Sequence, residues 1–213
     1  MGLCCLLLGA CADTADRPAA DRPQTYAVRP EDTLYSVAWR HDLDFRDLAR
    51  WNNIGADFRI SVGQVLLLGP PVPPRRPNSR VDETPAGMAR GGASSTYRWV
   101  WPTDRVGPPR AVQGGGILLS GRLGQDVRAA SAGRVVYAGS GLRGYGNLII
   151  LKHGDSLLSA YGHNRELLVR DGQEVAAGQV IAHMGEGAQQ APTLYFEIRQ
   201  NGKPVDPLPF ISR

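Results

Sequence analysis

The sequence predicts two small domains in series, a βααβ unit followed by a mainly antiparallel β unit. Apolar residues recur at helical spacing within residues 34–49, whereas short β-like segments separated by turn residues fill the chain from residue 97 onward. Much of the proline lies between Gly69 and Pro85, which is typical of an extended spacer. A chain of 213 residues is long enough for two such domains and a linker.

The first unit, residues 25–69, is predicted to contain a strand, two helices and a second strand. Thr25–Val28 has the pattern of a short strand, and a proline with capping side chains follows it. Gly63–Leu68 is expected to close the unit as a buried strand. Helical spacing occurs twice between these strands, in Leu34, Val37 and Ala38 and again in Phe45, Leu48 and Ala49.

The motifs of this unit resemble the LysM family in order and spacing. They are Tyr26-x-Val28, Asp32-Thr33-Leu34-x-x-Val37-Ala38, Leu48-x-x-Trp51-Asn52-Asn53-Ile54 and Ile60-x-x-Gly63-Gln64-x-Leu66. The resemblance implies binding to the N-acetylglucosamine-containing glycan of peptidoglycan, in a shallow groove between two loops. The residues expected at that groove are Asp32, Thr33, Leu34, Ile54, Ile60 and Ser61. Structural roles remain open, since Asp32 or Thr33 can cap the first helix and Ile54 can belong to the core.

The second unit, residues 97–213, is predicted to be antiparallel β structure. Its turn signals are Gly154-Asp155 and Asn201-Gly202. The segments with a strand pattern are Gly133–Gly139, Asn147–Lys152, Ser156–Tyr161 and Thr193–Arg199.

A composite of motifs in this unit resembles the LytM-type peptidoglycan peptidase family. It consists of Gly133-Arg-Val-Val-Tyr-Ala-Gly139, Arg143-Gly-Tyr-Gly-Asn-Leu-Ile-Ile150, His153-Gly-Asp155, Tyr161-Gly-His163-Asn164, Val175-x-x-Gly178-Gln-x-Ile181 and Phe196-Glu-Ile-Arg199. The resemblance covers nearly all of the unit and implies a fold like the duplicated hybrid motif. Within this family, Leu142–Ile150 and Leu158–Asn164 look most like the lipoprotein activators of cell-wall amidases.

The zinc-binding motifs of the active family members are altered in this sequence. Active members hold zinc through a His-x-x-x-Asp motif and the second His of a His-x-His motif. The first motif falls on Gly114–Leu118 and the second on Thr193–Tyr195, so that only His163 of a Tyr-x-His motif remains. We therefore expect no catalytic residue, no metal ligand, no cofactor and no hydrolysis. His41, His153 and His183 are expected to have surface or structural roles.

The altered site is expected to form a cleft that recognises a protein. Tyr, Arg and His side chains suit such recognition because they bury area and still make directed hydrogen bonds. By resemblance the partner is a periplasmic N-acetylmuramoyl-L-alanine amidase, whose activation promotes septal peptidoglycan splitting and daughter-cell separation. An active zinc endopeptidase and a passive tether between outer membrane and wall are the alternatives, and the tyrosines can also be packing residues. The expected cleft residues are Gly114, Leu118, Arg143, Tyr145, Asn147, His163, Thr193 and Tyr195.

The N-terminus indicates export and lipid attachment. An apolar run from Gly2 ends in Leu-Leu-Gly-Ala-Cys11, which resembles a bacterial lipobox. The resemblance implies lipidation of Cys11, a tether that completes residues 1–24, and anchoring in the outer membrane on its periplasmic face. An ordinary signal peptide is the alternative, and the true start codon can lie upstream.

Composition excludes two further classes of function. All three cysteines lie within the first 11 residues, so the two folded units have none for disulfides or thiolate metal sites. The net charge of +4 is scattered, with no basic stripe, and binding to nucleic acid is not expected. The predicted organisation is 1–24 signal and tether, 25–69 LysM unit, 70–96 linker and 97–213 LytM-type unit.

Overall fold

A computed structural model of the chain describes residues 24–71, 98–104, 107–187 and 189–211. Cys11, the expected lipidation site, and nearly all of the expected tether (1–24) and linker (70–96) lie outside these residues. Within the described part of the chain, no helix has the length and apolar composition needed to cross a membrane.

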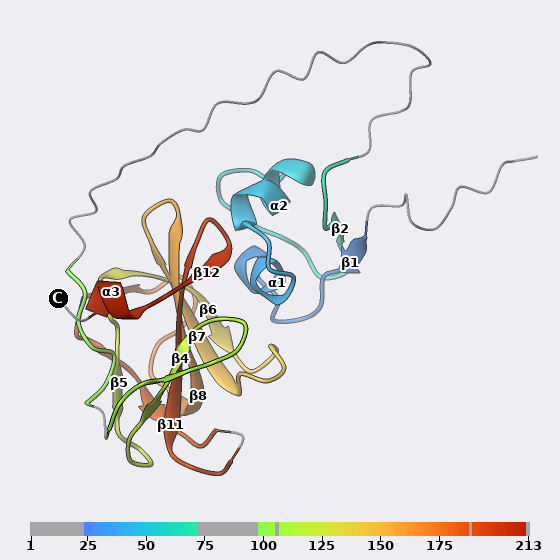
Figure 1. The fold of residues 1–213 in the computed structure, drawn as a ribbon. Coiled ribbons are helices and arrows are strands. Elements are labelled where there is room, and N and C mark those ends of the chain that lie inside the picture. Colours follow the sequence, from blue (N-terminus) through green and yellow to red (C-terminus); the bar gives the residue numbers. More distant parts are fainter. Residues whose placement is uncertain (1–23, 72–97, 105–106, 188, 212–213) are drawn as a thin grey trace, which may run out of the picture.

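The first module has the predicted βααβ order, shown at the blue end of the ribbon in Figure 1. Strands β1 and β2 pair antiparallel, with Thr25 opposite Leu67. Only Leu66 of the second strand is fully buried, and Val65 is 62% exposed. The expectation of a buried closing strand is therefore wrong for one face, because this two-stranded sheet is covered on one side only. The elements are β1 (Thr25–Ala27), α1 (Leu34–Arg40), α2 (Phe45–Trp51) and β2 (Val65–Leu67).

Side-chain caps define both short helices. The Thr33 hydroxyl accepts a hydrogen bond from the Ser36 amide at 3.1 Å, and the Ser36 hydroxyl accepts one from the Thr33 amide at 3.0 Å. This reciprocal capping box satisfies two amides that have no partner within the helix. Asp44 caps α2 without such a reciprocal bond, by accepting from the Arg46 amide at 2.8 Å. Thr33 therefore has the structural role that the sequence left open.

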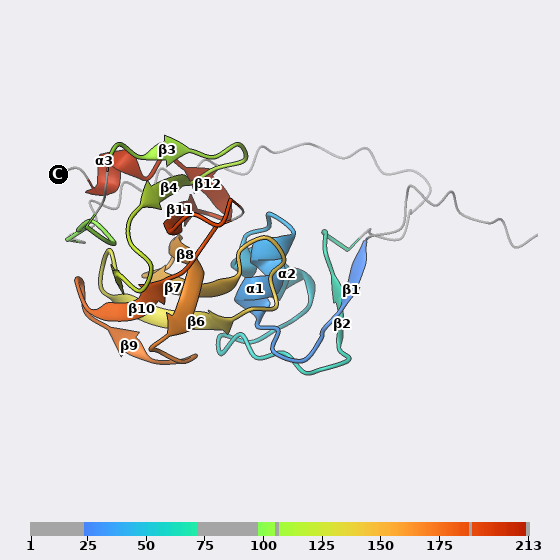
Figure 2. The same cartoon turned by 90° about the horizontal axis from the view of Figure 1, so that it is seen from below.

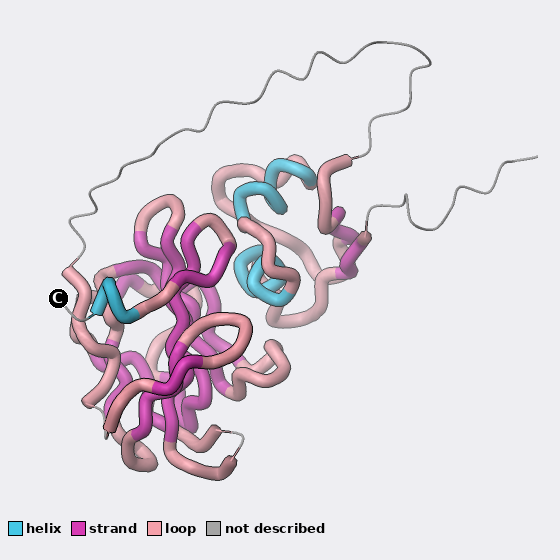
Figure 3. The backbone as a smooth tube through the Cα atoms, viewed as in Figure 1, coloured by secondary structure: helices cyan, strands magenta, loops and turns pink. Residues whose placement is uncertain are grey.

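The second module is a mainly antiparallel β domain, as predicted, and its strands fill the lower left of Figure 3. The main path of the sheet runs β3-β4-β11-β8-β7-β6-β9, and β10, β5 and β12 attach to it. The elements are β3 (Arg110–Ala111), β4 (Ile117–Ser120), β5 (Asp126–Arg128), β6 (Gly133–Gly139), β7 (Asn147–His153), β8 (Leu157–Leu167), β9 (Glu174–Val175), β10 (Val180–Met184), β11 (Thr193–Gln200), β12 (Lys203–Val205) and α3 (Leu208–Ile211).

Both predicted turns join paired strands. Gly154-Asp155 lies between β7 and β8, which pair from His153 and Leu157 onward. Asn201 and Gly202 join β11 to β12 with φ angles of 51° and 74°. Positive φ at both central residues is the requirement of a type I′ hairpin turn, and Asn-Gly meets it at low steric cost.

Strand β7 is buried on both faces, which explains its continuous apolar run. Ile149 and Leu151 point into the interior of the second module, whereas Leu148 and Ile150 belong to a cluster that also contains residues of the first module. All four are fully buried. A strand with one solvated face would alternate apolar and polar residues instead. The run in the sequence therefore reflects the covering of the outer face by the first module.

The two modules are packed against each other along this outer face. Figures 1 and 2 both show α1 beside the sheet, near β6. Leu34, Trp39 and Leu48 of the first module share one buried apolar cluster with Tyr137 and Leu158 of the second. Burial of each such side chain contributes about 1.5–3 kcal/mol. The seam between the modules is thus a hydrophobic core and not a loose contact.

Candidate functional site

Strands β4 and β11 bring together the positions at which the resemblance places zinc ligands. Leu118 lies directly opposite Tyr195 in the antiparallel register, and Ser120 lies opposite Thr193. Gly114 precedes β4 in a tight turn with a φ of 92°. The positions of the two altered motifs are therefore neighbours in space, although they are far apart in the sequence.

Tyr195 is held by a buried carboxylate. It is 8% exposed, and its hydroxyl donates a hydrogen bond to the Glu197 carboxylate. Glu197 is 1% exposed, and its Oε1 accepts a hydrogen bond from the Nε of Arg199 at 2.6 Å. Burial and the negative charge of Glu197 raise the pKa of Tyr195, so the phenol remains a protonated donor. The three side chains form a buried chain along alternate residues of β11.

His163 is the one histidine among the described residues that line this site. It lies on β8 with a φ of 62°, and its ring centroid is 6.0 Å from that of Tyr195. Its buried Nδ1 atom has no hydrogen-bond partner among the described residues. Burial lowers the pKa of His163, which keeps the imidazole neutral at pH 7.

These side chains open onto a cleft of about 550 Å³. We call it the cleft. Of the residues expected there, Gly114, Leu118, Arg143, Tyr145, His163 and Tyr195 contribute to its lining. The remaining lining residues are Asp42, Val112, Gln113, Gly144, Glu197 and Arg199.

Two expected cleft residues lie beside this lining and not in it. The Asn147 side-chain amide donates to the Arg165 carbonyl at 3.2 Å, and the Thr193 hydroxyl donates to the Ala191 carbonyl at 3.2 Å. Sequence reasoning did not single out Glu197 and Arg199 as cleft residues. Their period-2 spacing from Tyr195 on a strand was the available signal, because alternate residues share a face.

Asp42 of the first module also lines the cleft, and no local pattern could have indicated this. Its carboxylate forms an ion pair with Arg199 at 3.0 Å. Asp42 has a positive φ of 53° just after α1, and this conformation turns the chain toward the second module. The cleft is therefore built by both modules.

Three other histidines lie outside the cleft. His153 is 1% exposed and makes 2.7 Å contacts with the Ala132 carbonyl and the Ser159 hydroxyl. His183 lies 3.1 Å from Glu166 and 3.8 Å from Asp126. His41 follows α1 in the first module. Within the described residues, no group of three His, Cys, Asp or Glu side chains is placed to hold a metal ion.

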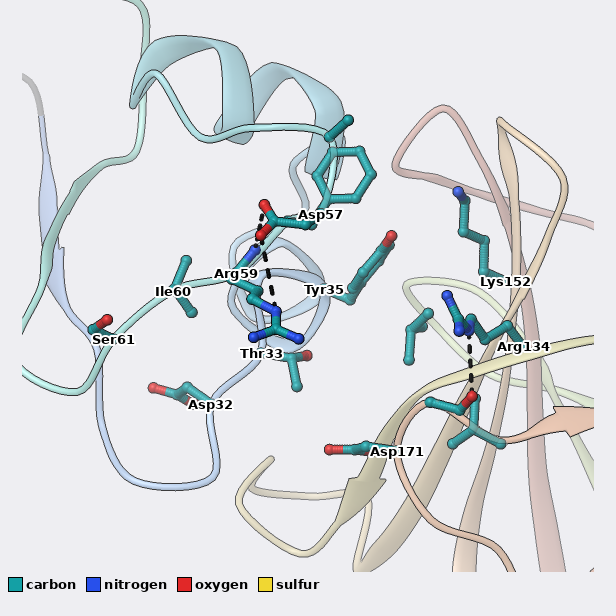
Figure 4. A pocket seen from close by; sticks show the side chains of 15 residues that line it. Asp32, Thr33, Tyr35, Asp57, Arg59, Ile60, Ser61, Arg134, Lys152 and Asp171 are labelled. Carbon is teal, nitrogen blue, oxygen red and sulfur yellow. Dashed lines mark hydrogen bonds and ion pairs between the residues drawn. The ribbon is translucent and has the colours of Figure 1, made fainter.

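The residues expected to bind glycan have unequal exposure. Leu34 is fully buried, and Ile54 packs against the shared core. Asp32 accepts hydrogen bonds from the Tyr26 hydroxyl at 2.6 Å and the Arg29 amide at 2.8 Å. These contacts hold the pKa of Asp32 below its ordinary value despite the opposing effect of partial burial. Asp32, Thr33, Ile60 and Ser61 line a second pocket, at the seam between the modules (Figure 4).

Comparisons with known proteins assign both modules. The family model described as LysM domain matches residues 26–69, and the model described as Peptidase family M23 matches residues 113–207. The chain is 40% identical to the Lipoprotein NlpD/LppB homolog of Pseudomonas aeruginosa, over 98% of this chain and 89% of that protein.

The names of two further relatives refer to murein hydrolase activation and to the outer membrane. The chain is 36% identical to Murein hydrolase activator NlpD of Escherichia coli, over 89% of this chain and 68% of the relative. It is 39% identical to Outer membrane antigenic lipoprotein B of Histophilus somni, over 85% of this chain and 65% of that relative. The chain therefore belongs to the NlpD/LppB lipoprotein family and joins a LysM domain to a domain of peptidase family M23.

Proposed function

We propose that this protein is a non-catalytic activator of a periplasmic N-acetylmuramoyl-L-alanine amidase. The observation that carries the proposal is the pairing of Leu118 with Tyr195 at positions where an active family member needs zinc ligands. Relatives named as murein hydrolase activators support the same class of function. In this proposal the chain itself breaks no bond.

The side chains at the altered site do not fit a catalytic zinc ion. Such an ion takes three protein ligands and leaves one position open for water. Leu118 offers only hydrocarbon, and the nearby Glu197 carboxylate is already bound by Tyr195 and Arg199. His163 alone could supply only one of the three protein ligands. The residues that remain favour recognition of another protein over hydrolysis.

The cleft has the composition of a protein-binding site. Arg143 and Tyr145 stand at its edge, and the Tyr145 ring packs edge-on against Tyr195 at 5.2 Å between centroids. Arg and Tyr are enriched among the residues that dominate binding energy at protein interfaces. Activation requires only that the cleft bind the active conformation of the amidase more tightly than the inactive one.

The proposed localisation rests on Cys11 and on the LysM module. Lipidation of Cys11 would hold the protein on the periplasmic face of the outer membrane, and the LysM module would bind peptidoglycan. The name of the Histophilus somni relative supports an outer-membrane location. At the division septum, an activator in this position would promote splitting of the wall between daughter cells.

The proposal is tested by dye release from labelled peptidoglycan. Purified protein from Ala12 onward is mixed with a candidate amidase, and each protein alone serves as a control. We expect release from the mixture and none from this protein alone. Arg143→Ala and Tyr145→Ala should each lower activation about 10-fold, as for interface residues worth over 1 kcal/mol. Arg122→Ala, at an exposed position outside the cleft, should not.

Two other outcomes would replace the proposal. Release by this protein alone would show that it is a hydrolase. If no tested amidase responds while the protein still binds peptidoglycan, the tether between membrane and wall becomes the better explanation.

A further inference from the structure

The second pocket, at the seam between the modules, has a volume of about 770 Å³ and is larger than the cleft. We call it the seam groove. One wall comes from the two LysM loops that carry Asp32, Thr33, Ile60 and Ser61. The other wall comes from the second module, through β6, β7 and the turn between β8 and β9. Figure 4 shows the side chains of the two walls facing each other.

The two walls of the seam groove are held in a fixed relation by packing. Tyr35, on α1 of the LysM wall, is 9% exposed and lies 4.6 Å from Phe45 between ring centroids. Val136, on the opposite wall, belongs to the same buried cluster. A preformed groove of this kind binds a ligand without the entropic cost of assembling its walls.

The wall from the second module carries two adjacent cations. Arg134 on β6 and Lys152 on β7 are direct partners in the antiparallel register. Like charges placed directly opposite on neighbouring strands are destabilising. Glu174 on β9 relieves one of them, because its carboxylate lies 3.2 Å from Arg134. Both groups of that pair are more than half exposed, so solvent screens their attraction.

Lys152 has no carboxylate partner among the described residues. Its ammonium lies instead 5.6 Å and 5.7 Å from the ring centroids of Phe45 and Phe58. Because both rings belong to the first module, the ammonium lies at the seam between the modules. A cation with aromatic neighbours and no anion is suited to receive a carboxylate from a ligand.

The acidic groups of the groove are already engaged. Asp32 pairs with Arg40 at 3.1 Å, and Asp57 lies 3.8 Å from Arg59. Asp171 accepts a hydrogen bond from the backbone of Ala138 but has no cationic partner among the described residues. The groove therefore holds one cation without a carboxylate partner, Lys152, and one acid without a cationic partner, Asp171.

We infer that the seam groove is a single binding site for a glycan that bears an acidic stem peptide. Sugar rings would contact the LysM wall, and a peptide carboxylate would bind between Lys152 and Arg134. This inference rests on the proposed peptidoglycan binding by the first module and extends it with residues of the second. The volume falls within the range of ordinary ligand sites, roughly 300–1,000 Å³.

The test compares two forms of one ligand by titration calorimetry. The protein from Ala12 onward is titrated with a wall glycan oligomer that bears stem peptides, and then with the same oligomer after removal of the peptides. We expect the peptide-bearing form to bind about 10-fold more tightly, as for a charge-assisted contact. Because the added contact is ionic, this preference should shrink as salt is raised.

Variants locate the preference. Lys152→Gln should weaken binding of the peptide-bearing oligomer about 5- to 10-fold and leave the peptide-free oligomer unchanged. Lys152→Arg should restore the preference. Arg122→Gln, which removes the same charge from another exposed position of the second module, should change neither affinity.

The outcomes separate this inference from the proposed function. Equal affinity for both oligomers, or an equal loss of both in Lys152→Gln, would overturn the composite site. If amidase activation persists in either case, only the composite site has failed. A peptide preference without amidase activation would support the composite site and reject the activator role.

Discussion

The guanidinium of Arg199 stacks on the ring of Trp39, with its central carbon 3.8 Å from the ring centroid. It also donates a 3.0 Å hydrogen bond to the Trp39 carbonyl. Arg199 belongs to the M23 domain and Trp39 to the LysM domain, and both are nearly inaccessible to solvent. Arg199 also pairs with Glu197 in the lining of the cleft, so one side chain connects the cleft to the seam.

Removing the Arg199 side chain should destabilise the whole protein. Arg199→Ala leaves the buried Glu197 carboxylate without its cation, and loss of one partner of a buried pair costs about 3–5 kcal/mol. Chemical denaturation measures the free energy of unfolding. Arg50→Ala is the matched control, because the Arg50–Asp47 pair is exposed and should contribute less than about 1 kcal/mol. Similar losses of unfolding free energy in the two variants would show that the buried Glu197–Arg199 pair stabilises the protein no more than an exposed pair does.

Gly202→Ala should weaken the docking of the modules. A Cβ atom at Gly202 would lie 2.5 Å from the backbone nitrogen of Asp44 in the LysM domain. Gly178→Ala is the control, since its φ of 80° resembles the 74° of Gly202 but no atom lies within 4 Å of an added Cβ. Both variants incur the strain of positive φ, about 1–2 kcal/mol. Gly202→Ala should lose about 1–3 kcal/mol more through overpacking. Equal losses of unfolding free energy in the two variants would mean that the seam accommodates the added methyl group without measurable cost.

Stability should fall as the pH decreases from about 6.5 to about 4. Burial lowers the pKa of His153 to about 4 from an ordinary value of 6.5. Between these values the unfolded chain binds a proton that the folded chain does not, so acid favours unfolding. The loss approaches about 3 kcal/mol at the lower end. His41 and His163, whose pKa values burial also lowers, contribute with the same sign.

The His153 contribution is isolated by substitution. His153→Gln should flatten the dependence of unfolding free energy on pH in urea titrations between pH 7 and pH 4.5. The slope is the informative quantity, because Gln changes the absolute stability as well. An unchanged slope would assign the acid sensitivity to other groups.

Tyr195→Phe should preserve the shape of the cleft while weakening its support. Phe keeps the ring that packs on Tyr145, but the Glu197 carboxylate loses the hydroxyl that donates to it. An unsatisfied buried acceptor costs about 1–3 kcal/mol. Differential scanning calorimetry would detect this as a lower Tm. Tyr145→Phe, at a less buried position, should shift Tm by less. An unchanged Tm in Tyr195→Phe would show that Arg199 alone satisfies Glu197.

Elements with strong local signals were predictable from the sequence. The capping residues before α1 and the apolar spacing of both helices indicated the βααβ order. Strands β6, β7 and β11 begin where the pattern placed them, and the Asn201-Gly202 turn joins strands as expected. Six strands escaped prediction, of which β3 and β9 contain two residues each and the others, β4, β5, β10 and β12, contain three to five. So short a strand shows no periodicity, and its pairing is determined by tertiary contacts.

The seam was not predictable because its determinants are not local. The run from Leu148 to Leu151 indicates burial on both faces but does not name the covering element. Asp42 has the appearance of a turn residue, and only the folded chain places it beside Arg199. The positions at which the resemblance places zinc ligands, by contrast, were predicted from motif spacing, and the strand register brings Leu118 and Tyr195 together.

The LysM domain contributes Ile60 to the seam groove and Asp42 to the cleft. The same small domain, packed against the sheet, therefore forms part of both openings. A hydrolase held at the cleft would meet the wall at one angle and at one distance from the sugar bound in the groove. The protein would then act as a ruler, and the positions of the cuts along a strand would be spaced by its own dimensions.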